Sequence, residues 1–124
     1  MIPRPVISIL SDKLPDLETH ASLDSLFMYA DAPGDVPEGN KSVKVQEWLN
    51  RTNKVSEQPL KVLGKLLEKY IELPDLETIP SYDTFKRSQY QESLEFKNSL
   101  IELLGKYSLT YIQGGIISSG GSLP

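Results

Sequence analysis

The chain has 124 residues, of which 39% are hydrophobic and 24% charged, values typical of one ordinary globular domain. Its 13 basic and 17 acidic side chains give a net charge of −4, so attraction of the whole chain to nucleic acid or to an acidic membrane is not expected. The absence of cysteine excludes disulfides, zinc ribbons and thiol nucleophiles. The sequence has neither a secretory signal pattern nor an apolar run of the roughly 20 residues that a membrane helix needs, so we expect a cytoplasmic protein without membrane contact.

The first half of the chain predicts three helices separated by loops. Apolar residues at three- and four-residue steps predict a short amphipathic helix that ends before Pro15. A second helix is expected to begin near Thr19 or Ser22, because both residues are favourable N-caps. Residues 31–40 contain two prolines and two glycines, which predicts a long exposed loop, and a third helix is expected over residues 42–52.

The second half predicts two longer helices and a terminal hairpin. Residues 57–73 carry the broadest apolar stripe, and a fifth helix is expected from about residue 82 or 84 to residue 106. Two short β-branched runs around Gln113-Gly114-Gly115 predict a β-hairpin, which must lie against helices or another chain because two strands alone are marginally stable. The aromatic residues expected in the core are Phe27, Trp48, Tyr70, Phe85 and Tyr90.

The predicted fold is therefore mainly α, with about five packed helices and a short C-terminal β-hairpin. Residues 1–119 are expected to form one domain, and residues 120–124, rich in glycine, are expected to begin a linker. The six-residue sequence Leu-Pro-Asp-Leu-Glu-Thr occurs at residues 14–19 and again at residues 73–78. Because the similarity does not extend far beyond these segments, we expect two loops that lead into capped helices rather than a structural repeat.

One segment has the composition of a phosphate-binding loop. Residues 34–42 contain two glycines followed by a lysine and a serine, but Asn40 separates the second glycine from Lys41, and Pro37 lacks an N–H donor. We therefore expect a connection that caps the third helix. His20, the only histidine, is expected at a helix start, because no nucleophile follows it at helical spacing. The sequence predicts no catalytic, metal or cofactor site.

Basic residues concentrate in the middle of the chain. Residues 40–70 hold seven basic and three acidic side chains, whereas both flanking segments are acidic. Lys61, Lys65 and Lys69 follow one another at four-residue steps on one helical ridge, and Arg51 precedes them. Such a ridge can bind the phosphates of a nucleic acid. Alternatively, it can be the solvated polar face of a helix, or it can form ion pairs with the acidic flanking segments or with a partner. Charge reversal at the three lysines is expected to leave the fold intact.

The predicted hairpin offers a second candidate surface. Unpaired strand edges are natural docking sites for another chain. Ile112, Ile116 and Ile117 would supply apolar side chains to such a contact. Aspartate in place of Ile116 or Ile117 is therefore expected to weaken binding of a protein partner.

Most of the chain resembles the N-terminal region of bacterial abortive-infection phage-defence proteins, the AbiJ-like group. The resemblance rests on residues 26–49 (LFMYADAPGDVPEGNKSVKVQEWL), residues 59–72 (PLKVLGKLLEKYIE) and residues 109–124 (LTYIQGGIISSGGSLP). It implies a non-catalytic sensing or oligomerisation module whose partner is another copy or an effector domain after residue 124. The alternative is a helical nucleic-acid-binding domain that uses residues 40–70.

Overall fold

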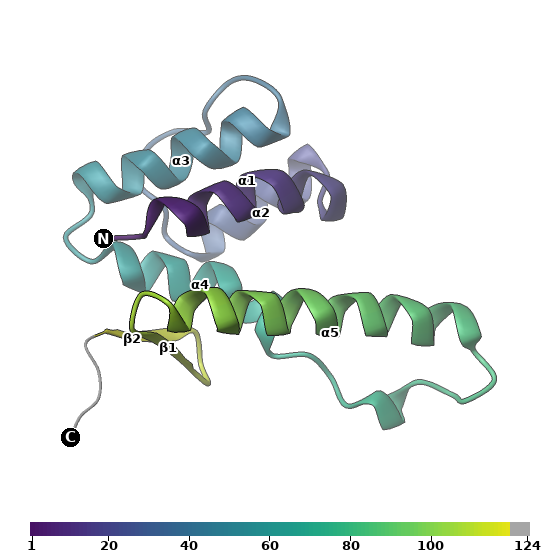
Figure 1. The fold of residues 1–124 in the computed structure, drawn as a ribbon. Helices are drawn as coiled ribbons and strands as arrows, with labels where there is room; N and C mark the ends of the chain where they lie inside the picture. The colour runs from purple at the N-terminus through teal and green to yellow at the C-terminus, as the bar shows by residue number, and fades with distance from the viewer. Residues whose placement is uncertain (120–124) are drawn as a thin grey trace.

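The computed structural model describes residues 1–119 (Figure 1). Its helices are α1 (Arg4–Leu17), α2 (His20–Tyr29), α3 (Lys41–Val55), α4 (Pro59–Ile71), the 3-10 turn η1 (Leu76–Thr78) and α5 (Thr84–Gly105). An antiparallel hairpin of β1 (Leu109–Ile112) and β2 (Ile116–Ser119) follows. The predicted mainly α fold with a C-terminal hairpin is confirmed. Residues 120–124, predicted to begin a linker, lie outside the described residues.

Local side-chain caps set the starts of α2 and α3. The Thr19 hydroxyl accepts a hydrogen bond from the Ser22 N–H (3.1 Å), and the Ser22 hydroxyl accepts one from the Thr19 N–H (2.8 Å), which forms a capping box. The Asn40 side chain accepts a hydrogen bond from the Val43 N–H (2.9 Å). Asn40 is the residue that interrupts the phosphate-loop pattern, so the loop over residues 31–40 ends in a helix cap, as predicted.

Helix α1 continues past the point where the sequence predicts its end. The predicted end before Pro15 is wrong, because α1 runs to Leu17 with Pro15 in its last turn. The proline removes one N–H donor, and a lysine stabilises this turn from outside the helix. The Lys41 ammonium donates to the carbonyl oxygens of Pro15 (2.8 Å) and Glu18 (3.0 Å). A cation at this position also interacts favourably with the helix dipole.

The two copies of the repeated hexapeptide have different structures. Residues 14–19 contain the last turn of α1 and the N-cap of α2, whereas residues 73–78 lie in the connection between α4 and α5 and end in η1. The expectation of a loop is therefore right for the second copy and wrong for the first. The surrounding chain, and not the hexapeptide, decides which structure forms.

One apolar cluster joins the helices. At its centre the rings of Phe27 and Trp48 stack with their centroids 4.6 Å apart. The Tyr70 ring meets the Phe96 ring edge-on at 5.6 Å. Phe27, Trp48 and Tyr70 are all buried, as predicted.

The N-terminal half of α5 and the connection before it project from the rest of the molecule (Figure 1). We call residues 72–95 the arm. The buried residues of α5 all lie beyond the arm, at Phe96, Leu100 and Leu104. Phe85 is 71% exposed, so its predicted place in the core is wrong, because α5 extends beyond the other helices at this position. Tyr90 is only partly buried. The Arg87 guanidinium holds the connection to the helix by donating to the carbonyl oxygens of Ile79 (3.0 Å) and Pro80 (3.2 Å).

The hairpin packs on α4 through a close contact between two glycines. A Cβ added to Gly64 would lie 2.3 Å from the carbonyl oxygen of Gly115, so only glycine permits this approach. Beside it, the Lys65 ammonium donates to the Gly114 carbonyl (2.9 Å). The Gly114 N–H in turn donates to the Glu72 carboxylate (2.7 Å). The hairpin therefore rests on a helix, as its marginal stability as an isolated unit requires.

Candidate functional site

The glycine-containing loop before α3 binds a cation of the protein itself. A phosphate-binding loop directs its N–H groups at an anion. Here the carbonyl oxygens of Pro33 (3.2 Å) and Asp35 (2.6 Å) accept hydrogen bonds from the Arg51 guanidinium. Gly34, with φ of +84°, makes room for that guanidinium, which a Cβ would approach to 2.4 Å. The loop is thus occupied by Arg51.

The lysines of the predicted basic ridge lie in different surroundings. The Lys69 ammonium lies 2.7 Å from the Glu18 carboxylate, and Lys65 donates to the Gly114 carbonyl at 2.9 Å. Lys61 is exposed and makes no ion pair or side-chain hydrogen bond with any residue of the described chain. The structure therefore does not gather the three lysines into one free basic surface. Because Lys65 and Lys69 contact other parts of the fold, we now expect charge reversal at these two positions, unlike at Lys61, to affect the stability of the fold.

Reversing the charge of Lys69 is expected to destabilise the fold, whereas reversing that of Lys61 is not. Lys69→Glu would place a second carboxylate against the buried carboxylate of Glu18, at a cost of about 2 kcal/mol. Lys61→Glu changes an exposed side chain and is expected to alter stability by less than about 0.5 kcal/mol. Thermal unfolding of the two variants, followed by circular dichroism, would measure the difference. Equal melting temperatures would show that the pair between Lys69 and Glu18 contributes nothing.

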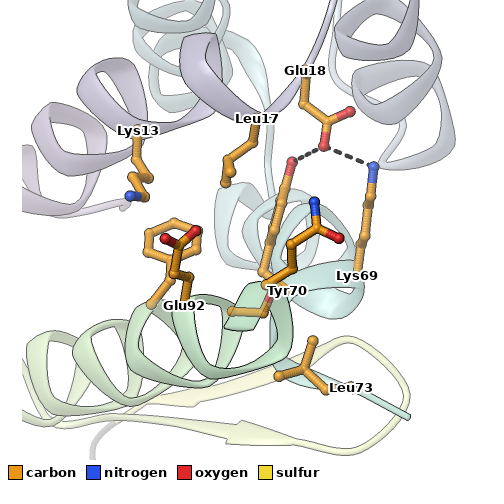
Figure 2. A pocket seen from close by; sticks show the side chains of 10 residues that line it. Lys13, Leu17, Glu18, Lys69, Tyr70, Leu73 and Glu92 are labelled. Atoms are coloured by element: carbon orange, nitrogen blue, oxygen red, sulfur yellow. Dashed lines mark hydrogen bonds and ion pairs between the residues drawn. The ribbon is translucent and has the colours of Figure 1, made fainter. Parts of the chain in front are cut away.

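Glu18 connects three helices. Its side chain is buried at the end of α1, and its Oε2 accepts hydrogen bonds from the Tyr70 hydroxyl (2.7 Å) and the Lys69 ammonium (2.7 Å) of α4 (Figure 2). Its main-chain carbonyl accepts the Lys41 bond from α3. Burial on its own raises the pKa of Glu18, but the hydrogen bonds from Lys69 and Tyr70 outweigh this effect and hold the pKa below its usual value. Burial, together with the bond to Glu18, raises the pKa of Tyr70 well above its usual value.

A pocket of about 380 Å³ opens beside Glu18, between the ends of α1 and α4 and the middle of α5 (Figure 2). Tyr70 and Phe96, both buried, form its floor. Leucines and polar side chains complete the lining: Leu17, Leu73, Lys13, Lys69, Gln89, Glu92 and Ser93. The pocket has the size and the apolar floor of a small-molecule site.

The part of the chain that the structure describes contains no metal-binding cluster of side chains. Residues 1–119 contain no group of three or more histidine, cysteine, aspartate or glutamate side chains that could hold a metal ion. His20 lies exposed at the first residue of α2, the helix start predicted for it. Among residues 1–119, no helix combines the length and the apolar character needed to cross a membrane.

The hairpin turns two of the three predicted isoleucines outward. Ile112 and Ile116 are cross-strand partners and are 47% and 52% exposed. Ile117 pairs with Tyr111 on the opposite face, where both side chains pack against the core. Ile112 and Ile116 remain candidates for docking a partner. Ile117 is instead part of the fold, so aspartate there would disturb the hairpin itself.

The arm carries exposed aromatic side chains in an acidic segment. Tyr82 is 84% exposed in the turn before α5, and Phe85 is 71% exposed in its first turn. This end of α5 projects away from the other helices (Figure 1). The arm contains six acidic and two basic residues. The arm as a whole therefore combines exposed aromatic side chains with an excess of acidic residues, while its two basic residues, Lys86 and Arg87, directly follow Phe85.

The opposite end of the molecule combines apolar and positively charged side chains. Met1 and Val55 are both strongly exposed there, at the N-terminus and at the end of α3 (Figure 1). The residue after Met1 forms hydrogen bonds through its N–H and its carbonyl with the Asn53 side chain (2.7 and 3.0 Å), which holds the N-terminus beside α3. Arg4 and Lys54 line the same groove between α1 and α3. We call Met1, Arg4, Lys54 and Val55 the basic end.

Comparison of the chain with protein-family models, with curated proteins and with solved structures gave no match. A functional assignment therefore rests on the chemistry of the surfaces described above.

Proposed function

We propose that this chain is a non-catalytic self-association module in which the arm of one copy binds the basic end of the next. The observation that carries the proposal is the exposure of Tyr82 and Phe85 on an acidic projection. A single exposed apolar residue is ordinary on a protein surface. Two neighbouring exposed aromatic residues surrounded by charged residues resemble a protein–protein interface, which has an aromatic-rich centre and a polar rim.

The two ends complement each other in charge and in apolar character. Before its aromatic residues the arm carries Asp75 and Glu77, with Asp83 between Tyr82 and Phe85, and these acids outnumber Lys86 and Arg87, which follow Phe85. The basic end offers Arg4 and Lys54 beside exposed Met1 and Val55. Opposite charges would steer the encounter, and burial of the aromatic rings against apolar side chains would supply most of the affinity. Because the contact joins two different surfaces, it would extend beyond a dimer into a ring or a filament.

Sedimentation velocity on the chain and two single-surface variants tests this proposal. We expect concentration-dependent association of the unmodified chain with a Kd on the order of 10–100 μM, weakened by salt. Phe85→Asp disrupts the binding surface of the arm, and Lys54→Glu disrupts that of the basic end. Each variant alone is therefore expected to stay monomeric. In a mixture of the two variants, the intact arm of Lys54→Glu can bind the intact basic end of Phe85→Asp. The mixture is therefore expected to form dimers and nothing larger.

Ile116→Asp on the hairpin is the matched control, because Ile116 is also an exposed apolar residue. It is expected to leave association unchanged. If Ile116→Asp prevents association while Phe85→Asp does not, the interface lies on the hairpin and the proposal is wrong. A chain that stays monomeric near 1 mM, well above that range of Kd, would also contradict it.

The resemblance to abortive-infection proteins supports a cellular context for this proposal, namely phage defence in the bacterial cytoplasm. Self-association of such a module would bring effector domains of several chains together. In a bacterium that produces this protein, Phe85→Asp is then expected to reduce protection against phage. Unchanged plaque counts from a variant that has lost self-association would argue against this context without affecting the physical interaction.

The alternative in which residues 40–70 bind nucleic acid has less support. Most cations of this segment are held by other groups of the same chain, and the nearly buried Lys44 pairs with Asp24 at 2.8 Å. The basic residues with such internal contacts are Lys41, Lys44, Arg51, Lys65 and Lys69. These contacts fit the interpretation that the basic segment pairs with the rest of its own fold.

A further inference from the structure

We propose that the pocket beside Glu18 binds a small zwitterion with an apolar body, of the class of α-amino acids with large aliphatic or aromatic side chains. The inference does not depend on self-association. Three helices contribute to the pocket, and its volume of about 380 Å³ lies within the range of small-molecule sites.

The floor and one wall of the pocket suit an apolar group. The Tyr70 and Phe96 rings meet edge-on at the floor, and both are buried. Leu17 and Leu73 lie at the sides, and Leu17 is 47% exposed (Figure 2). A ligand side chain placed against Leu17 and the Phe96 ring would remove apolar surface from water, which favours binding.

The charged side chains of the pocket favour a ligand that carries one positive and one negative charge. Glu18 and Lys69 already neutralise each other at 2.7 Å. Lys13 of α1 and Glu92 of α5 remain, and within residues 1–119 neither takes part in an ion pair or a side-chain hydrogen bond. The Lys13 ammonium lies 5.8 Å from the centroid of the Phe96 ring, so it is turned over the pocket floor.

A zwitterion would satisfy both free charges at once. Lys13 would donate to the ligand carboxylate, and Glu92 would accept from the ligand ammonium, while the apolar side chain covers Phe96. A ligand with a carboxylate alone would leave Glu92 facing a like charge, and one with an ammonium alone would face Lys13 in the same way. This repulsion is the basis of the expected selectivity.

Titration followed by NMR of leucine methyl groups tests the site. The probes are L-phenylalanine and L-leucine, with 3-phenylpropanoate and 2-phenylethylamine as analogues that each lack one charge. We expect saturable shifts of the Leu17 and Leu73 methyls with both amino acids, with a Kd on the order of 1 mM, and clearly weaker binding of both analogues. Because Lys13 lies on α1 and Glu92 on the arm, a ligand bound to both would link the two elements, so L-phenylalanine is also expected to slow amide exchange in the arm.

Lys13→Gln and Glu92→Gln are each expected to weaken L-phenylalanine binding about tenfold, whereas the matched variants Lys61→Gln and Glu95→Gln are not. All four residues are exposed, so the fold is expected to persist, and circular dichroism would verify it. The proposal is overturned if neither amino acid gives saturable shifts. It is equally overturned if an analogue binds as tightly as L-phenylalanine, or if both pocket variants bind like the unmodified chain.

Discussion

Gly64→Ala is expected to lower the free energy of unfolding by about 3 kcal/mol, or the Tm by roughly 10 °C. The added methyl group would lie 2.3 Å from the carbonyl oxygen and 2.8 Å from the carbonyl carbon of Gly115. These are backbone atoms, so no side-chain rotation can relieve the overlap. Gly115 has φ of +75°, a conformation that few other residues adopt, so the turn cannot readily rearrange and the hairpin must move away from α4.

Gly105→Ala is the control for this variant. An added Cβ at Gly105 would meet no atom within 4 Å, and alanine favours the helix that Gly105 ends. Its stability is expected to change by less than about 1 kcal/mol. Trp48, the single tryptophan, is buried against Phe27 and reports unfolding by fluorescence. A Gly64→Ala variant as stable as Gly105→Ala would show that the hairpin does not rest on α4 in solution.

Glu18→Gln is expected to lower the free energy of unfolding by about 2 kcal/mol at neutral pH. It is also expected to make that free energy less dependent on pH in the acid range. Hydrogen bonds from Lys69 and Tyr70 outweigh burial and hold the pKa of Glu18 below its usual value. A carboxyl with a lowered folded-state pKa contributes stability above its unfolded pKa, about 4.3, and loses it as the pH falls through the folded pKa. The difference in unfolding free energy between the unmodified chain and Glu18→Gln is therefore expected to be constant at neutral pH and to become smaller below about pH 4.3.

Urea unfolding between pH 7 and pH 3, with Trp48 fluorescence, would measure this profile. Some acid sensitivity should remain in the variant, because hydrogen bonds from the Tyr111 hydroxyl and the Gly114 N–H lower the pKa of Glu72 as well. Glu95→Gln, which removes an exposed carboxyl from α5, is expected to keep the stability of the unmodified chain at neutral pH. A difference between Glu18→Gln and the unmodified chain that grows toward low pH would contradict the assigned direction of the pKa shift.

Features that depend on neighbours along the chain were predictable from the sequence. Thr19 and Asn40 cap helices through bonds to residues three positions away, so the residue types alone indicate the helix starts. Gly114 and Gly115 both have positive φ, which the glycine pair between two β-branched runs predicts. Helical spacing likewise predicts the existence of the five helices, with ends that differ by a few residues.

Features that depend on distant residues were not predictable in this way. The last turn of α1 depends on Lys41, which lies 26 residues beyond Pro15. The bond between Glu18 and Tyr70 joins residues 52 positions apart, so no motif could indicate it. Phe85 resembles a core residue in its helical spacing, but no other helix covers it, and only the three-dimensional arrangement reveals this.

The anchored N-terminus determines where a fusion partner can be attached. Ile2 is fully buried and bound through its backbone to Asn53, so a tag placed before Met1 would leave the molecule directly from the basic end. Such a tag would cover the surface that we propose for the arm of the next copy. A cleavable N-terminal tag would then hold the purified protein as a monomer, and a site-specific protease would start assembly at a chosen moment.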